Sequence, residues 1–301
     1  MTDRGMTKKT NIPLVRIVLP AYNQGRYIDD AIDSLKRQTF QDFEVILLDD
    51  GSDDGFTPKK LAAIEYDKIT EKHLFTENVG TAKRYNSFIK NAENKYVVIL
   101  CGDDILEPTF LEECVNFLEA HPNHAAVATD YDHFGEEDIG YQGVLKISEE
   151  KISLINFLLD YAAQYLGSCL MRKEALDQFT LPELERKSDL NRWIYFLENG
   201  WELGVINKML FNYRKLSNSQ MFTTTIDIEL NVKAQTYDLH EDSFRKYAKE
   251  IFLDQYKQIR HLQGEVAERE AKIQRIINSR RYKIGLTFSA PYRFLRRLFS
   301  K

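Results

Sequence analysis

The sequence predicts an α/β protein built on a doubly wound, mostly parallel sheet, followed by a helical C-terminal extension. Short apolar runs alternate with helix-period segments through the first 130 residues, an order typical of parallel strands joined by crossover helices. Several of these runs end in polar clusters. From residue 226 the chain is polar and helix-rich, with few helix breakers before residue 277.

The first elements are the clearest. Residues 14–20 (LVRIVLP) form a short apolar run ended by a proline, which indicates a buried strand. The apolar residues that follow have the i, i+3, i+4, i+7 spacing of one helix face: Ile28, Ala31, Ile32 and Leu35. Phe43–Leu48 is a second buried strand, and it stops at the turn cluster Asp49-Asp50-Gly51-Ser52.

The same alternation continues to residue 129. In chain order, we expect a weaker helix over 57–65, a short strand over 73–76, a helix over 81–92, a buried strand over 96–100, a helix opened by Pro108 and a strand over 125–129. The buried strand Tyr96–Leu100 ends at Cys101-Gly102-Asp103-Asp104. Residues 140–220 mix helices and short strands and continue the same domain.

Polar clusters follow three strands: Ala21-Tyr22-Asn23, Asp49 to Ser52, and Gly102-Asp103-Asp104. Ligands of doubly wound sheets bind outside the carboxyl ends of the strands, so these clusters should face one crevice. Paired carboxylates there suit a hard divalent cation, which takes one or two carboxylates plus substrate phosphates. A single Asp-Asp pair commonly makes only a turn, but two pairs at neighbouring strand ends favour a site.

Other patterns narrow the function. No G-x-G-x-x-G follows the first strand and no G-x-x-x-x-G-K-[ST] occurs, which argues against a dinucleotide-binding dehydrogenase and a P-loop NTPase. The three cysteines have no metal-ligand spacing and suit reduced thiols. The start of the chain has no apolar signal region, and no apolar run approaches the ~18 residues of a membrane span. A cytoplasmic location is therefore expected.

Charge divides the chain into an acidic body and a basic end. Residues 271–301 contain nine Lys or Arg and no Asp or Glu, so the remainder carries −5 − 9 = −14. Aromatic and aliphatic residues interleave with these cations, which predicts contact with an anionic membrane surface, on the inner face of the cell membrane. The acidic body argues against nucleic-acid binding. Residues 226–277 predict one or two extended helices that form a homo-oligomer interface or a simple arm.

Four segments in order resemble the successive motifs of family 2 glycosyltransferases: Val15–Asn23, Gln38–Gly55, Asn78–Asn86 and Tyr96–Pro108. Farther on, residues 188–193 (SDLNRW) resemble the family's ED-x-x-x-W segment, and Tyr213-Arg214 resembles the Y-R that follows. The resemblance implies a GT-A, Rossmann-like domain over roughly residues 10–220, with an extension over 221–301. It also implies inverting transfer of a sugar, as in bacterial surface-polysaccharide synthesis.

The resemblance also implies a site map. The nucleotide of the donor, expected to be a UDP-sugar, would contact Pro20, Tyr22, Asn23, Asp50, Asn78, Lys83, Arg84 and Gly102. Asp103 would bind the divalent metal, Mn²⁺ or Mg²⁺. Asp189 would be the general base that activates the acceptor hydroxyl of a glycan or lipid-linked acceptor. Further donor or acceptor contacts are expected from Asp104, Trp193 and Arg214.

Some positions depart from the family pattern. Cys101 stands where the family's D-x-D usually begins, Tyr85 replaces a common arginine, Ser188 replaces the glutamate before the base, and Leu216 replaces a common histidine. Two alternatives stay open. One is a sugar-phosphate nucleotidylyltransferase, which would want a glycine-rich, arginine-bearing loop after the first strand. The other is a non-catalytic nucleotide-sugar-binding or scaffold protein.

Overall fold

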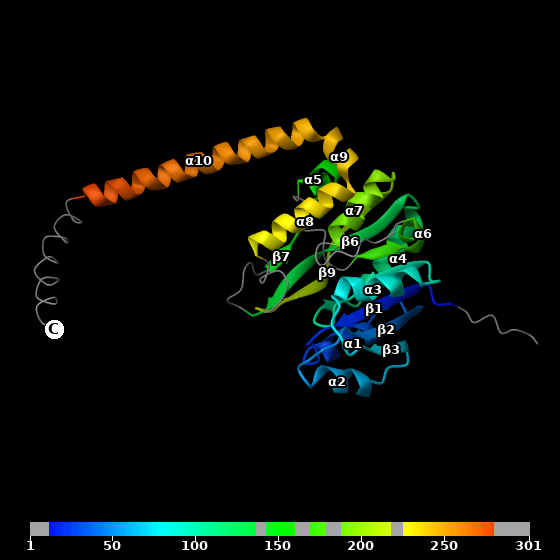
Figure 1. The fold of residues 1–301 in the computed structure, drawn as a ribbon. Coiled ribbons are helices and arrows are strands. Elements are labelled where there is room, and N and C mark those ends of the chain that lie inside the picture. Colours follow the sequence, from blue (N-terminus) through cyan, green and yellow to red (C-terminus); the bar gives the residue numbers. More distant parts are fainter. Residues whose placement is uncertain (1–11, 137–142, 160–168, 179–187, 218–224, 280–301) are drawn as a thin grey trace, which may run out of the picture. The chain divides into compact units, whose positions relative to one another are not determined.

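A computed structural model describes residues 12–136, 143–159, 169–178, 188–217 and 225–279 (Figure 1). Within these residues the strands form one nine-stranded sheet in the order β3-β2-β1-β4-β8-β6-β9-β5, with β7 beside β6. The strands are β1 (Val15–Ala21), β2 (Phe43–Asp49), β3 (Ile69–Leu74), β4 (Tyr96–Ile99), β5 (Ile105–Leu106), β6 (His124–Gly135), β7 (Gly143–Leu145), β8 (Leu170–Arg172) and β9 (Glu202–Lys215). The α/β fold class is confirmed.

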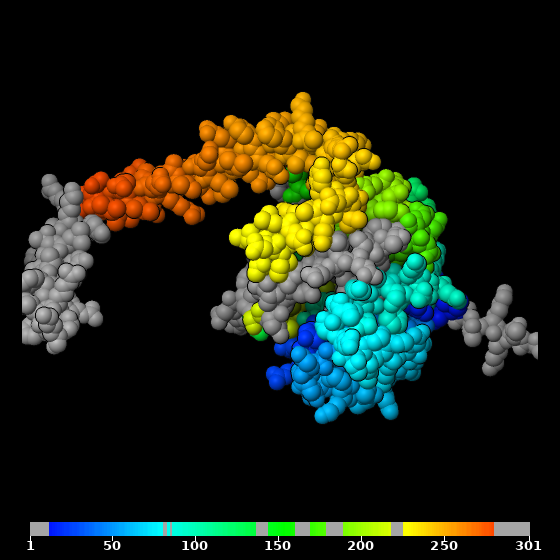
Figure 2. Space-filling model, viewed as in Figure 1, coloured from blue at the N-terminus to red at the C-terminus, as the bar shows by residue number. Residues whose placement is uncertain are grey.

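The helices follow the predicted alternation. They are α1 (Ile28–Lys36), α2 (Thr57–Ala63), α3 (Thr81–Lys90), α4 (Phe110–Ala120), α5 (Leu154–Leu158), α6 (Lys173–Asp177), α7 (Ser188–Glu198), α8 (Ile226–Leu239), α9 (Glu241–Lys246) and α10 (Ala248–Asn278), with a 3₁₀ turn over Glu149–Lys151. The four apolar residues predicted to share one face of α1 are all buried. The space-filling view shows α3 (cyan) at the surface (Figure 2).

The N-terminal half of the sheet is parallel. β1 pairs in parallel with β2 and with β4, and β2 pairs in parallel with β3. Every residue of β2 is buried, as expected for a central parallel strand covered on both faces. The carboxyl ends of β1, β2 and β4 consequently lie at one edge of the sheet, where the three polar clusters begin.

The C-terminal half of the sheet is mixed. The three-residue strand β8 lies antiparallel to both β4 and β6, and β5 is antiparallel to β9. The prediction of a mostly parallel sheet therefore describes the first four strands best. The strand predicted over 125–129 continues to Gly135, because β9 pairs with it in parallel as far as Gly135↔Lys215.

The strand predicted over 73–76 was misplaced. It spans Ile69–Leu74 and pairs with β2 from Val45↔Ile69 to Asp49↔Leu74. None of its side chains is buried, so no apolar run marks it in the sequence. Backbone pairing with β2, at an edge of the sheet, sets its position.

The first compact unit runs to Phe244, beyond the boundary predicted at residue 220. The reason is that α8 packs on α7. His240, just after α8, lies 2.8 Å through Nδ1 from Glu198 Oε2 and 3.2 Å through Nε2 from Asn191 Oδ1. Asn191 Nδ2 also donates to Thr236 Oγ1 at 3.3 Å, and Val232 is buried.

The second unit begins at Arg245 and contains α10. The predicted extended helices are present, and α10 has 31 residues, none of them buried. Among the described residues, no helix is both long and apolar enough to cross a membrane. The basic segment predicted over 271–301 lies outside the described residues from residue 280 onward.

Candidate functional site

The ends of β1 and β2 are joined by hydrogen bonds. Asp50 N–H donates to Ala21 O at 3.0 Å, and Asn23 N–H donates to Ser52 Oγ at 2.9 Å. Asn23 Nδ2 donates to Asp53 Oδ1 at 2.8 Å. Asn23 has a φ of 57°, a left-handed conformation that asparagine tolerates better than most residues. The first two polar clusters therefore form one surface, as predicted.

Asp50 is a fully buried carboxylate with one oxygen committed and one free. Its Oδ1 accepts from Arg84 Nε at 2.8 Å and from Val79 N–H at 3.3 Å. Its Oδ2 is buried and has no hydrogen-bond partner among the residues that the structure describes. A buried acceptor without a partner is costly, so this oxygen is a natural place for a donor group of a ligand.

Arg84 is fixed by three contacts. Besides Asp50, its Nη2 donates to Glu77 O at 2.6 Å, and its guanidinium lies 3.7 Å from the centroid of the Phe75 ring. The loop after β3 is thereby tied to the turn after β2. Gly51 makes this close approach feasible, because a Cβ there would lie 2.3 Å from the carbonyl carbon of Glu77.

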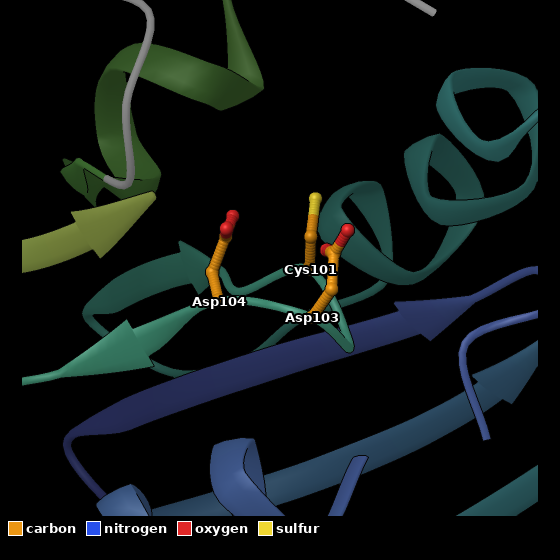
Figure 3. A group of neighbouring side chains, drawn as sticks. All are labelled: Cys101, Asp103 and Asp104. Atoms are coloured by element: carbon orange, nitrogen blue, oxygen red, sulfur yellow. The ribbon is translucent and has the colours of Figure 1, made fainter. Parts of the chain in front are cut away.

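The third cluster joins the same edge. Gly102 N–H donates to Pro20 O at 3.0 Å, and a Cβ on Gly102 would lie 3.1 Å from the Ala21 side chain. Figure 3 shows Cys101, Asp103 and Asp104 pointing to the same side of the loop that follows β4. One sulfur or oxygen atom from each lies within 4.8 Å of the others.

The two carboxylates of this loop are unfavourable as a charged pair. Burial raises the pKa of Asp103, which a hydrogen bond from Gln24 and the charge of Arg214 partly oppose. Burial also raises the pKa of Asp104 well above its usual range, and the neighbouring charge of Asp103 raises it further. A bound divalent cation would offset both effects, because it neutralises adjacent carboxylates in a buried site.

Arg214, on β9, links this loop to α1. Its backbone N–H donates to Asp104 Oδ1 at 2.9 Å, its Nε donates to Asp103 O at 2.8 Å, and its Nη2 donates to Asp30 Oδ2 at 2.6 Å. The guanidinium also lies over the rings of Tyr27 and Phe134. Sequence reasoning missed Asp30, because nothing in the exposed face of α1 signals a partner on a strand 184 positions away.

Asp189 comes from α7 and is only partly buried. Burial raises the pKa of the Cys101 thiol well above its usual range, and the charges of Asp104, Asp103 and Asp189 add to this effect. The charge of the Asp189 carboxylate therefore reaches the Cys101 thiol, as the charges of Asp103 and Asp104 do. Trp193 is 2% exposed, so its ring belongs to the core; a contact with donor or acceptor stays a prediction.

The remaining predicted residues lie around this edge at the surface. Tyr22, Asn78 and Lys83 are exposed. Asn78 Oδ1 accepts from Gly80 N–H at 3.2 Å, which shapes the turn before α3. Gln24 was not predicted as a site residue, although it follows Asn23 directly in the first cluster.

The strand ends of the parallel half of the sheet thus bring a buried aspartate and a carboxylate-rich loop to one edge, which is where open α/β sheets bind their ligands. Residues 16–180 match the family described as "Glycosyl transferase family 2". The chain belongs to this family and is a glycosyltransferase.

Relatives of the chain agree. It is 28% identical over 221 residues to the putative teichuronic acid biosynthesis glycosyltransferase TuaG of Bacillus subtilis, covering 69% of this chain and 81% of TuaG. It is 26% identical to the uncharacterized glycosyltransferase RP339 of Rickettsia prowazekii, covering 96% of this chain and 99% of the relative.

Two solved structures share the fold. Residues 1–349 of TarS from S. aureus, in complex with UDP-GlcNAc, align with a TM-score of 0.57 and 19% identity, covering 77% of this chain and 72% of that one. The mannosyltransferase PcManGT of Pyrobaculum calidifontis, with GDP-Man and Mn²⁺, aligns with a TM-score of 0.56 and 16% identity, covering 93% and 85%. The chain spans 60% of the length of a further structure of S. aureus TarS 1–349.

Proposed function

We propose that this chain transfers a sugar from a UDP-sugar to an acceptor hydroxyl, with inversion at the anomeric carbon, in the synthesis of a cell-surface polysaccharide or glycoconjugate. The observation that carries the proposal is the free Oδ2 of the fully buried Asp50, at the same sheet edge as Asp103. Because the chain belongs to glycosyl transferase family 2, the alternative of a sugar-phosphate nucleotidylyltransferase is excluded.

Asp50 would recognise the base of the donor. Its Oδ2 can accept a hydrogen bond, and the uracil ring offers an N–H donor for it. Arg84 keeps Oδ1 occupied and holds the carboxylate in place. Tyr22 and Asn23, beside this turn, would contact the base and ribose, and Pro20 and Gly102 would form the floor through their backbone contact. Asn78 and Lys83 would lie beside the nucleotide at its exposed side.

Asp103 would hold the divalent metal, with Cys101 and Asp104 close by. The two aspartates fit a hard divalent cation, because their buried carboxylates lie together and each disfavours the charge of the other. When bound, Mn²⁺ or Mg²⁺ neutralises the charge that develops on the leaving diphosphate. The Arg214 hydrogen bonds to the loop would position Asp103 and Asp104.

Asp189 would act as the general base. It removes the proton from the acceptor hydroxyl while the hydroxyl oxygen attacks the anomeric carbon, and the bond to the nucleoside diphosphate breaks on the opposite face. This single displacement inverts the anomeric centre. The partly buried position of Asp189 near the Cys101 loop supports this role.

The names of the relatives support a cell-surface polysaccharide as the product and a UDP-sugar as the donor. TuaG is named for teichuronic acid biosynthesis, and TarS was solved with UDP-GlcNAc. PcManGT was solved with GDP-Man and Mn²⁺, so GDP is the competing nucleotide for the same fold.

The donor can be tested by thermal unfolding with UDP, GDP, dTDP, CDP or ADP, each with and without Mn²⁺. A ligand that binds only the folded state at a hundredfold excess over Kd stabilises it by ~2.7 kcal/mol. We expect UDP to stabilise the chain in a metal-dependent way, and Asp103→Ala to lose the metal dependence. A shift with GDP alone would replace UDP in the proposal, and no shift with any nucleotide would overturn nucleotide binding.

The alternative of a non-catalytic binding protein makes a different prediction. It would bind UDP in the thermal experiment but would not consume the donor. Release of UDP from UDP-GlcNAc or a related UDP-sugar, measured with an acceptor extract present, separates the two functions.

We also propose that residues 271–301 bring the enzyme to an anionic membrane surface, where a lipid-linked acceptor would lie. The nine cations of this segment support the proposal, since each contributes about 1 kcal/mol near such a surface. Flotation with anionic vesicles should be lost when residues 271–301 are removed. Equal flotation of both chains would contradict the proposal.

A further inference from the structure

The helix α10 exposes its largest apolar residues. Phe252, Ile259, Val266 and Ile273 are 66%, 53%, 54% and 53% exposed, and no residue of the 31-residue helix is buried. A helix of ~46 Å at 1.5 Å per residue derives most of its stability from packing of an apolar face, so this face calls for a partner.

The spacing of these residues identifies the kind of partner. Phe252, Ile259, Val266 and Ile273 recur every seven residues. Leu262 and Ile276 lie three residues after Ile259 and Ile273. This is the a and d pattern of a coiled coil, in which a seven-residue repeat keeps the seam facing a second helix. Gly264 falls at an outward f position, where it faces no partner.

The β-branched residues at three a positions and Leu262 at d suit two parallel strands, whereas Ile276 at d is more usual in coils of three or four strands. The a positions carry three β-branched residues and a phenylalanine, and d carries Leu262 and Ile276. Branched residues at a with leucine at d favour a two-stranded parallel coil. The other two d positions are Gln255 and Arg269, and polar residues in the seam set register and strand number at a cost in stability.

The charges at the seam fit a second copy of this chain as the partner. In a parallel pair, the hole that receives a d residue is bordered by the e residue of the facing helix. In register, Arg269 of the two copies would face each other at d, and each positive charge would be offset by Glu270 at the adjoining e position of the facing helix. In an antiparallel pair that sets Phe252 opposite Ile276, Arg269 would lie opposite Ile259 instead.

We propose that α10 pairs with α10 of a second copy as a parallel, in-register, two-stranded coiled coil. The proposal limits the homo-oligomer interface predicted over 226–277 to this helix, because α8 and the residue after it already bond to α7 through Thr236 and His240. It does not depend on the transferase chemistry.

The mass of the full-length chain, measured by sedimentation equilibrium, tests whether the a and d residues of α10 hold two copies together. We expect a dimer for the wild type, a monomer for Ile259→Asp/Val266→Asp, and a dimer for the matched control Ala267→Asp/Ala271→Asp at the outward b and f positions. Circular dichroism checks that the variants stay folded. A monomeric wild type, whether or not it binds anionic vesicles, would overturn the proposal, as would dimers of all three chains.

The charge pair and the orientation have separate tests. Glu270→Arg should raise the dimer dissociation constant at least tenfold, Arg269→Glu/Glu270→Arg should restore it, and the control Glu268→Arg at a c position should not change it. Leu262→Cys should form a disulfide-linked dimer on mild oxidation, whereas the control Ala271→Cys should not. Failure of Leu262→Cys to cross-link within a dimer would overturn the parallel register.

Discussion

Asp189 tests the chemistry at the level of a single residue. We expect Asp189→Asn to lower kcat by ~10²- to 10⁴-fold, the usual contribution of a positioned base, with little change in nucleotide binding. The amide keeps the shape of the side chain but cannot take the acceptor proton. Initial rates of UDP release and the UDP-induced stabilisation measure the two properties separately.

Asp177→Asn serves as the matched control for this change, because Asp177 is an exposed aspartate of α6 paired with Lys173. It should leave kcat unchanged. Near-normal transfer by a folded Asp189→Asn enzyme would remove Asp189 from the mechanism.

Arg84 tests the buried ion pair with Asp50. Arg84→Ala leaves the Asp50 carboxylate buried without its counter-charge, and breaking such a pair costs about 3 kcal/mol or more. We expect a lower urea midpoint together with weaker nucleotide binding. Adding Asp50→Asn should recover part of the stability, because the uncompensated charge is gone, but should not recover the binding.

The exposed neighbour Lys83 gives the control for Arg84, since surface substitutions usually change the free energy of unfolding by less than about 0.5 kcal/mol. If Lys83→Ala and Arg84→Ala shift the urea midpoint equally, the Asp50–Arg84 pair is not the source of the stability.

At the level of elements, the turn after β2 depends on Gly51. Its φ is 72°, and a Cβ would meet the Glu77–Asn78 backbone at 2.3 to 2.5 Å. Gly51→Ala should therefore cost more than the ~1–2 kcal/mol of a left-handed alanine, and should displace the loop that carries Asn78 and leads to Arg84. Chemical denaturation gives the stability and UDP titration gives the affinity.

Gly55 lies in the same turn region and provides a control with the same backbone handedness. Its φ is 67°, but a Cβ there would meet nothing within 4 Å. Gly55→Ala should show only the backbone penalty and keep UDP affinity. Equal effects of the two substitutions would mean that handedness, and not the approach of the loop, limits Gly51.

At the level of the whole molecule, the first unit needs α8. A chain ending at residue 220 loses the buried Val232 and the Asn191–Thr236 and His240–Glu198 contacts, whereas one ending at 244 keeps them. Burying one valine side chain alone is worth about 1.5 kcal/mol or more. We expect the chain ending at 220 to melt at a lower temperature than the chain ending at 244, whose first unit is complete.

A matched comparison removes only the second unit. Chains ending at 244 and 301 should bind UDP with the same affinity, because the residues proposed for the nucleotide all lie before Phe244. Thermal unfolding of the three chains, with and without UDP, measures both properties. If the chain ending at 220 were as stable as the chain ending at 244, the boundary at Phe244 would be wrong.

The sequence by itself determined the parallel half of the sheet and the meeting of its polar strand ends. Strong apolar runs mark β1, β2 and β4, and parallel strands must bring their carboxyl ends to one edge. Ala21–Asn23, Asp49–Ser52 and Gly102–Asp104 therefore had to lie together, and they do. The heptad in α10 is equally local, because its period can be read along one segment.

Only the tertiary structure decided the rest, because those features depend on partners far apart in the chain. The edge strand β3 has no apolar pattern, and its backbone pairing with β2 sets its position. Arg214 reaches Asp30 across 184 positions, and His240 binds Glu198 and Asn191 on another helix. The free Oδ2 of Asp50 is also a tertiary fact, since Arg84 and Val79 occupy only the other oxygen of the carboxylate.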